Sequence, residues 1–331
     1  MRSWNIIGNR RYGYLFSALV IIPGLIALAV WGINLGIDFT GGTLLDVRVA
    51  RDASVEEVRG VMASFNQAEA VIQQSADRPR EFIIRTETLD EATTARVTAA
   101  LGQRFGGVDV LLAERVGPKI GRELRNRAIL AVSIGLVLQV VYITWRFRSL
   151  RFALAADIAL VHDLLVVAGL YALTRRQVDS SFVAVLLTVI GYSVNDTVVI
   201  FDRIRETLAQ RIRASFPELV NRSILEVLVR SLTTGAGALM AIVAIYFLGG
   251  VTIRDFAFGL AIGVVTGSYS SILVASPVIV EWHNWSERRA GRRPEAPRAA
   301  EPVREQAAVG GPQPTGRRPG GTRPGRRRNR R

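Results

Sequence analysis

Six long apolar runs, separated by polar segments, dominate the pattern of residues along the chain. They cover residues 14–33, 128–144, 152–173, 182–201, 227–248 and 256–280. A helix of about 17 to 25 apolar residues is long enough to cross the hydrocarbon core of a bilayer. The pattern therefore predicts an all-α membrane bundle of six transmembrane helices.

The first run also has features of a secretory signal. Three arginines lie in or before its start, and Ala-Leu-Ala at 27–29 is typical of a cleavage site. Its length of about 20 residues instead favours an uncleaved span. The positive flank would then keep the N-terminus in the cytoplasm.

A different pattern, of short alternating and helical segments, fills the region between the first two runs. Strands are predicted at 43–49, 70–74, 81–86 and 108–116, and helices at 54–65 and 90–105. Ser54 and Glu57 match a capping box, and Gly106 and Gly107 end the second helix. The order β-α-β-β-α-β is that of the ferredoxin-like motif. Because no catalytic cluster occurs here, we expect a small α+β ferredoxin-like domain that binds a partner or acts as a lever.

The distribution of charge orients these segments. The loop at 145–151 and the C-terminal segment are rich in arginine, as cytoplasmic segments are. Six spans then place both termini in the cytoplasm and the small domain outside, although Arg175 and Arg176 count against placing their loop outside. The predicted divisions are a cytoplasmic N-terminus (1–13), a first transmembrane helix (14–35), an extracytoplasmic domain (36–127), a five-helix transmembrane bundle (128–282) and a basic cytoplasmic tail (283–331).

Two polar segments lie on the predicted cytoplasmic side. Residues 202–226 are expected to form an amphipathic helix broken at Pro217. Residues 284–331 carry fourteen arginines and four glutamates, and so supply +10 of the net charge of +14. Beyond Arg289, the content of proline, glycine and arginine predicts disorder. We favour a solvated tail, with attraction to anionic lipid or to a ribosome as the alternative.

The composition excludes several classes of site. The chain has no cysteine, which rules out disulfides and thiolate metal sites. Its two histidines, His162 and His283, are too few for a multi-histidine metal site, and the phosphate-binding pattern GxxxxGK[ST] is absent. We therefore expect no metal, no cofactor, no nucleic-acid partner and no enzymatic activity.

Asp196 lies inside the fourth apolar run. Counted back from Arg203, it lies about 10 Å inside the hydrocarbon boundary. A carboxylate at such a depth costs roughly 3 kcal/mol, so it should be neutral, paired or in contact with water. One interpretation is a structural carboxylate hydrogen-bonded between helices. The other is a proton-binding site, because intramembrane acids are functional candidates by default.

Arg230 is the one arginine placed within a span, several Å in from the polar Glu226. Its depth is counted from the cytoplasmic side, as for Asp196. An unpaired buried arginine is unfavourable, so an ion pair between Arg230 and Asp196 is the economical arrangement.

Two further acids lie within the third run. Asp157 is about 9 Å in from Arg151, and Asp163 lies nearer the middle of the membrane. His162, beside Asp163, can change charge in the physiological range. A single histidine next to an acid is more often structural than part of a proton relay.

Several short motifs occur at wide spacing along the chain. They are GIDFTGGT at 36–43, VGP at 116–118 with Gly121 and EL at 123–124, HD at 162–163, GYS at 191–193 with ND at 195–196, DRIRE at 202–206, and RS at 230–231 with Thr233. In this order and spacing they resemble the motifs of the SecD/SecF family of protein-export membrane subunits, over residues 4–285. SecD members have a far larger outer domain, so the short domain here is more similar to the SecF branch.

The resemblance implies a fold like half of an RND-type transporter body, with SecD supplying the other half. It implies a bacterial inner-membrane protein, surrounded by lipid, that uses the proton motive force to complete SecA-driven export through the SecYEG channel. Exported polypeptides would contact the outer domain.

The resemblance also implies roles for individual residues. It assigns Asp196 and Arg230 to a proton pathway, with Asp163 as a further candidate, whereas Asp157 departs from the family pattern. The residues expected to have structural roles are Gly36, Asp38, Gly41, Gly42, Asn195 and Thr233.

Two other functions remain open at this point. The first is a self-sufficient, proton-driven RND exporter of small molecules. Such exporters usually carry two six-span halves and large outer domains, whereas this chain has one half and one small domain. The second is a purely structural partner whose buried charges only hold helices together. Proton flux through the assembled complex would separate that function from export.

Overall fold

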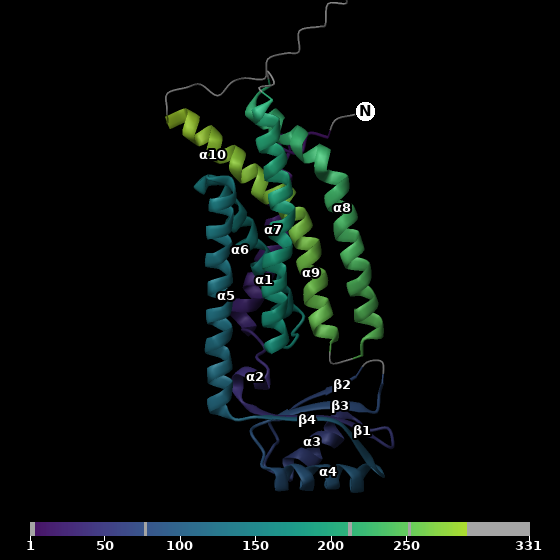
Figure 1. Ribbon diagram of the computed structural model, residues 1–331. Helices are drawn as coiled ribbons and strands as arrows, with labels where there is room; N and C mark the ends of the chain where they lie inside the picture. Colours follow the sequence, from purple (N-terminus) through teal and green to yellow (C-terminus); the bar gives the residue numbers. More distant parts are fainter. Residues whose placement is uncertain (1–3, 76–77, 211–213, 251–252, 290–331) are drawn as a thin grey trace, which may run out of the picture. The chain divides into compact units, whose positions relative to one another are not determined.

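The structure is a computed structural model that describes residues 4–75, 78–210, 214–250 and 253–289 (Figure 1). The described residues form one compact unit, in which the long helices stand side by side. The tail beyond residue 289, and with it the predicted disorder, lies outside the described residues.

Long helices carry the six apolar runs, which confirms the predicted spans. They are α1 (Arg10–Trp31), α5 (Pro118–Phe147), α6 (Leu150–Leu173), α7 (Ser180–Ala209), α8 (Phe216–Leu248) and a last helix built from α9 (Arg254–Ser270), a π-helical turn η1 (Ser271–Ala275) and α10 (Ser276–Arg289). Each is long and apolar enough to cross a bilayer. The most apolar part of α6 is 56% buried and that of α5 and α8 only 11%, so α6 is central and α5 and α8 are peripheral.

The polar segment at 202–226 differs from the prediction. Helix α7 continues to Ala209, and α8 begins at Phe216. Pro217 lies in the first turn of α8, behind a capping box formed by Ser215 and Glu218. Proline is tolerated in a first turn because its missing N–H would have no helical partner there. The expected amphipathic helix broken at Pro217 is therefore wrong; the segment extends two membrane helices instead.

Ion pairs and aromatic side chains join the helices at the end where the 145–151 loop lies. Arg146 on α5 pairs with Asp202 on α7 at 2.6 Å, and Arg203 on α7 pairs with Glu226 on α8 at 2.5 Å. Just inside this charged layer, the rings of Phe147 and Phe201 make an edge-to-face contact with centroids 5.9 Å apart. These contacts set the relative heights of α5, α7 and α8.

A small domain follows α1, and it contains the predicted order of strands and helices. A short helix, α2 (Ile37–Thr40), leads into β1 (Gly42–Val49), α3 (Val55–Ala63), β2 (Val71–Gln74), β3 (Glu81–Thr86), α4 (Glu91–Phe105) and β4 (Val108–Val116). The sheet order is β2-β3-β1-β4, and every neighbouring pair is antiparallel. Helices α3 and α4 lie on one face of the sheet (Figure 1). The fully buried core residues between them and the sheet include Leu45, Val47, Val58, Met62, Phe82, Ile84, Val97, Leu101 and Phe105.

Local capping explains where the helices of this domain begin and end. Ser54 and Glu57 form the predicted capping box at the start of α3. Asp90 caps α4 by accepting a hydrogen bond from the Thr93 backbone N–H at 2.9 Å. Hydrogen bonds from Thr93 hold the pKa of Asp90 below its usual value of 3.8. Gly106 ends α4 at φ 77°, a left-handed conformation that favours glycine.

Candidate functional site

A buried polar cluster surrounds Asp163, in the middle of α6. The Asp163 side chain is fully buried. Its Oδ2 atom accepts hydrogen bonds from Ser193 Oγ on α7 at 2.6 Å and from Ser270 Oγ on α9 at 2.8 Å. Its Oδ1 atom lies 2.9 Å from Nδ1 of the neighbouring His162. Three polar partners therefore satisfy a carboxyl group that would otherwise be costly to bury.

His162 extends this cluster toward α1. Its Nε2 atom lies 3.0 Å from Ser17 Oγ on α1 and 3.3 Å from the Tyr269 hydroxyl on α9. The Tyr269 ring also contacts the His162 ring edge-on, with centroids 5.5 Å apart. We call Ser17, His162, Asp163, Ser193, Tyr269 and Ser270 the Asp163 cluster. The hydrogen bonds of the cluster join α6 to α1, α7 and α9.

Hydroxyl groups continue from this cluster toward the π-helical turn. Thr197, one turn after Ser193 on α7, lies with its Oγ1 atom 2.8 Å from Ser271 Oγ. Ser271 is the first residue of η1, and Ser276 donates a hydrogen bond back to its carbonyl at 2.8 Å. Isolated π-helical turns often occur at functional sites. Thr197 is next in sequence to Asp196, and both side chains are buried.

Asp196 itself is buried, with 4% of its surface exposed. Ser231 on α8 lies beside it. Even so, Asp196 Oδ2 and Ser231 Oγ have no hydrogen-bond partner within the described residues. Unlike Asp163, this carboxyl group is incompletely satisfied. A buried polar atom without a partner is costly, and such atoms in native proteins indicate strain, function or a missing ligand.

The predicted ion pair between Asp196 and Arg230 is not formed. Arg230 lies on an exposed face of α8, and it makes no ion pair within the described part of the chain. Its neighbour Ser231 is buried toward Asp196 instead. Successive residues of a helix point about 100° apart, so Ser231 and Arg230 cannot both face α7. The two charged side chains therefore do not face each other.

Two predicted structural residues are exposed, as Arg230 is. Asn195 on α7 is exposed, next to the buried Asp196. Thr233 on α8 is exposed too, and it donates a hydrogen bond to the Val229 carbonyl at 2.7 Å. Asn195, Arg230 and Thr233, together with the exposed Thr234, place polar groups on the surface of membrane-spanning helices. Lipid tails offer no hydrogen bonds, so such a surface is suited to contact with protein.

Asp157 has no partner either. Both of its carboxylate oxygens are buried without a hydrogen bond within the described residues. It is not part of the Asp163 cluster.

The glycine-rich motif forms the joint between the small domain and the helices. Asp38 accepts a hydrogen bond from the Ser180 backbone N–H at 2.8 Å, at the start of α7. Gly36 donates to the Val178 carbonyl, also at 2.8 Å. The aspartate and the first glycine of the motif thus tie α2 to the loop between α6 and α7.

The paired glycines of the motif allow the backbone to pass close to α5. A Cβ atom on Gly41 would lie 2.8 Å from Pro118 Cα, and a Cβ atom on Gly121 would lie 2.8 Å from Gly41 N. Gly41 and Gly42 have φ values of 78° and 146°, which side chains other than glycine rarely adopt. The structural roles predicted for this motif therefore have a physical basis.

The two outer arginines that opposed the predicted topology have structural partners. Arg176 pairs with Asp255 at the start of α9, and its guanidinium lies 4.0 Å from the centroid of the Phe258 ring. Arg175 donates a hydrogen bond to the Trp31 carbonyl at 3.2 Å. These contacts stabilise both arginines at this end of the helices.

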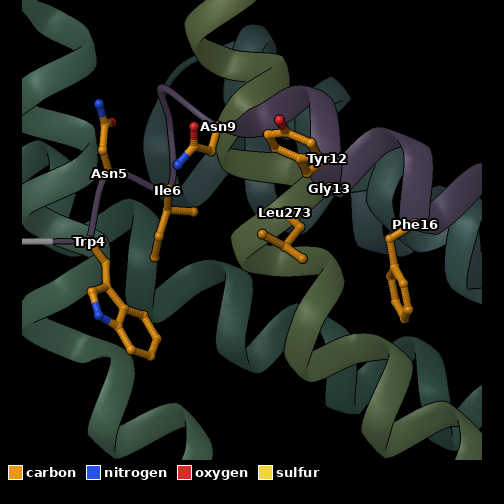
Figure 2. A pocket seen from close by; sticks show the side chains of 8 residues that line it. All are labelled: Trp4, Asn5, Ile6, Asn9, Tyr12, Gly13, Phe16 and Leu273. Carbon is orange, nitrogen blue, oxygen red and sulfur yellow. The ribbon is translucent and has the colours of Figure 1, made fainter.

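An apolar groove of about 440 Å³ lies near the start of α1 (Figure 2). Trp4, Tyr12 and Phe16 supply aromatic rings, and Leu273 of η1 lies across from them. None of its lining residues is acidic or basic. Likewise, the described residues contain no group of three His, Asp or Glu side chains placed to hold a metal ion. The candidate site is therefore the set of buried polar groups between α6, α7, α8 and α9.

Comparisons with known proteins agree with these motifs. The family model described as "Protein export membrane protein SecD/SecF, C-terminal" matches residues 97–285, more than half of the chain. The chain belongs to the SecD/SecF family. A second model of the SecD/SecF family, described as "SecD/SecF GG Motif", matches residues 26–53, which contain the joint described above.

Relatives in the SecD/SecF family match most of the chain. Protein translocase subunit SecF of Thermobaculum terrenum is 39% identical, over 89% of this chain and 99% of that protein. Protein translocase subunit SecF of Anaerolinea thermophila is also 39% identical, over 86% of this chain and 98% of that protein. The chain is thus similar to these SecF proteins along nearly their whole length.

Solved SecDF structures share the fold. The crystal structure of SecDF, a translocon-associated membrane protein from Thermus thermophilus, matches with a TM-score of 0.79 and 37% identity over 85% of this chain. SecDF in a super-membrane-facing form matches with a TM-score of 0.65 and 35% identity over 88% of this chain. The matched regions are 39% and 40% of those SecDF chains, so this chain spans about two fifths of them.

Sequence reasoning identified the acids of the site but missed most of their partners. The hydroxyls of Ser17, Ser193, Tyr269 and Ser270 were not predicted as ligands of His162 and Asp163. The sequence signal that could have predicted such partners is the concentration of serines at one height of the last span, opposite His162 and Asp163.

Proposed function

We propose that this chain forms half of an export-accessory complex with a SecD-type subunit. The observation that carries the proposal is that Asn195, Arg230 and Thr233 are polar side chains exposed on the membrane-spanning helices. Such a surface needs a protein partner within the bilayer. SecD is the partner that the fused Thermus SecDF supports, because that longer chain contains a region like this one together with more sequence.

We further propose that the complex uses the proton motive force to complete SecA-driven export through SecYEG. Asp196 is the proposed proton carrier, because it is buried, incompletely satisfied and close to the polar surface. Arg230, one residue from Ser231, is the proposed charge partner in a second state, reached by a modest rotation of α8 or with the partner subunit in place. Asp163 is the proposed second proton site, held by the Asp163 cluster.

The proposed role of the small domain is to contact exported polypeptides and move with the bundle. Its order of elements and its sheet order β2-β3-β1-β4 support a ferredoxin-like fold. The tight joint at the glycine motif supports transmission of motion between α5, α7 and the domain. No catalytic activity and no cofactor are part of this proposal.

The proposed location is the bacterial inner membrane, with both termini in the cytoplasm. The ion pairs that join α5, α7 and α8 lie at the end with the arginine-rich loop, which supports a cytoplasmic placement of that end. A self-sufficient RND exporter is disfavoured, because the chain provides one six-helix half and one small domain.

Reconstitution tests the proposal. The chain should copurify with a SecD-type subunit, and vesicles that hold both should complete late export faster when a proton gradient is imposed. Vesicles with either subunit alone should show no such stimulation. If the complete complex exports at the same rate with and without the gradient, only the role of a structural partner would remain for this chain.

A further inference from the structure

A polar cavity of about 310 Å³ lies where the small domain meets the chain that follows α1. It is separate from the buried acids between the membrane helices. Its lining comes from the segment around α2, from the connection between α3 and β2, and from the end of β3. Arg85, the next-to-last residue of β3, is its one basic lining residue.

Arg85 has no partner in the part of the chain that the structure describes. Its Nε atom is buried without a hydrogen bond, and it makes no ion pair. Burial lowers the pKa of Arg85, although Asp255 and Asp179 oppose this effect. A guanidinium carries five N–H donors and no acceptor. The buried Nε–H donor is therefore unsatisfied, and a ligand with acceptors would provide a partner for it.

The other lining side chains limit the kind of ligand that fits. Glu69 and Glu87 line the same cavity, and both are exposed to it or to solvent, so an anion would be repelled. Asn66 and Gln67 also line it, and their side-chain amides make no hydrogen bond within the described residues. An amide both donates and accepts. The set suits a neutral, dipolar ligand with donors and acceptors in alternation, as in a peptide backbone.

The strand β2 offers such a backbone a place to pair. It is the end strand of the sheet order, so one of its sides has no strand partner among the described residues. Val71, its first residue, lines the cavity and is 50% exposed. Its Cα partner across the ladder is Arg85. An unpaired strand edge binds an extended chain through main-chain hydrogen bonds, with little dependence on sequence.

We propose that the β2 edge and the adjoining cavity bind an extended segment of unfolded polypeptide, whose carbonyl groups accept hydrogen bonds from Arg85. This inference rests on the proposed function, because it identifies where the small domain would hold an exported chain. Sequence-independent pairing is suited to that task, since exported chains differ in sequence. About four residues of the bound chain would lie along β2, the length of that strand.

The first test is binding to the purified full chain. The probe is a fluorescent peptide of alternating valine and threonine, compared with a copy that is N-methylated at alternate residues. We expect the unmodified peptide to bind and N-methylation to weaken binding about tenfold or more, because it removes main-chain donors. Equal binding of the two peptides would overturn the proposal.

Arg85→Met separates ligand binding from a structural role. Removing an unpaired, desolvated charge should leave thermal stability unchanged or raised, while peptide binding weakens about tenfold. A variant that binds the peptide as wild type does, or that melts at a lower temperature, would show that Arg85 serves the fold instead. Inorganic phosphate serves as the anion control and should not compete with the peptide.

Cross-linking then tests the site during export. The chain has no cysteine, so Val71→Cys introduces a single thiol beside the cavity. Ala99→Cys, on the exposed side of α4, is the matched control. A stalled precursor that carries cysteines should form a disulfide with the first variant and not with the second. If gradient-stimulated export proceeds and neither variant cross-links, the proposed peptide-binding site is wrong and the proposed function stands. If the wild-type complex shows no stimulation by the gradient, the proposed function fails, whatever the result with the peptides.

Discussion

Removing the two serines that donate to Asp163 should have a cost that is more than additive. Ser193 and Ser270 donate to the same atom, Asp163 Oδ2, at 2.6 and 2.8 Å. Each alanine substitution alone leaves one donor, so we expect a loss of about 1 kcal/mol in the free energy of unfolding. Replacing both leaves a fully buried oxygen without a donor, which adds a desolvation penalty of about 1 to 3 kcal/mol. The double variant should therefore exceed the sum of the singles by about 1 kcal/mol or more.

Reversible unfolding in mixed micelles measures this coupling. Ser223 supplies the control, because it is fully buried between α7 and α8 but donates only to neutral groups, Thr207 Oγ1 at 3.0 Å and the Leu219 carbonyl at 2.9 Å. Ser223→Ala should cost about 0.6 kcal/mol, as typical hydrogen bonds between membrane helices do, and should add to Ser193→Ala without coupling. Additive losses in the Ser193/Ser270 pair, each no larger than that of Ser223→Ala, would refute the shared carboxylate.

Three further predictions concern the joint, the small domain and the topology. Gly121→Ala should lower stability by about 1 to 3 kcal/mol, because its Cβ would meet backbone atoms at 2.8 Å, whereas Gly117→Ala, with open space around it, should be nearly neutral in the same melting assay. The pKa of Asp90 in the folded state lies below its usual value of 3.8. The Asp90 carboxylate therefore stabilises the folded state fully above pH 3.8, and this stabilisation is lost as the pH falls below the folded-state pKa. Hydrogen exchange in α4 should become faster at low pH in the wild type, but this change should be absent in Asp90→Asn. In this cysteine-free chain, Ala68→Cys should react with an impermeant maleimide in intact cells and Ser149→Cys should not, and the reverse pattern would contradict the six-span topology.

Local sequence signals were sufficient to predict most elements of the small domain. The capping box at Ser54 and the glycine stop at Gly106 are encoded within a few residues, and the strands follow from alternation. The apolar runs likewise predict the spans, because helix length is set by bilayer thickness. The segment before Pro217 was misjudged, since proline signals both a break and a first turn, and local sequence does not distinguish them.

The candidate site was predicted less completely, because it depends on the rotation of helices about their axes. Depth follows from counting residues along a helix. The direction in which a side chain points changes by about 100° from one helical residue to the next. A rotation of α8 by one residue therefore decides whether Arg230 or Ser231 faces α7. The serines around Asp163 come from three other helices, and no local pattern predicts which of them meet.

The most direct test of the proposed mechanism is gradient-driven export by Asp196→Asn. Asparagine keeps the size and polarity of the side chain but cannot bind and release a proton. In vesicles that contain the SecD-type partner, late export without ATP should lose its stimulation by a proton gradient, while expression and association with the partner stay near normal. Asp157→Asn, which removes an intramembrane acid outside the proposed pathway, should retain the stimulation. Full stimulation in Asp196→Asn would contradict Asp196 as the proton carrier and make Asp163 the next candidate.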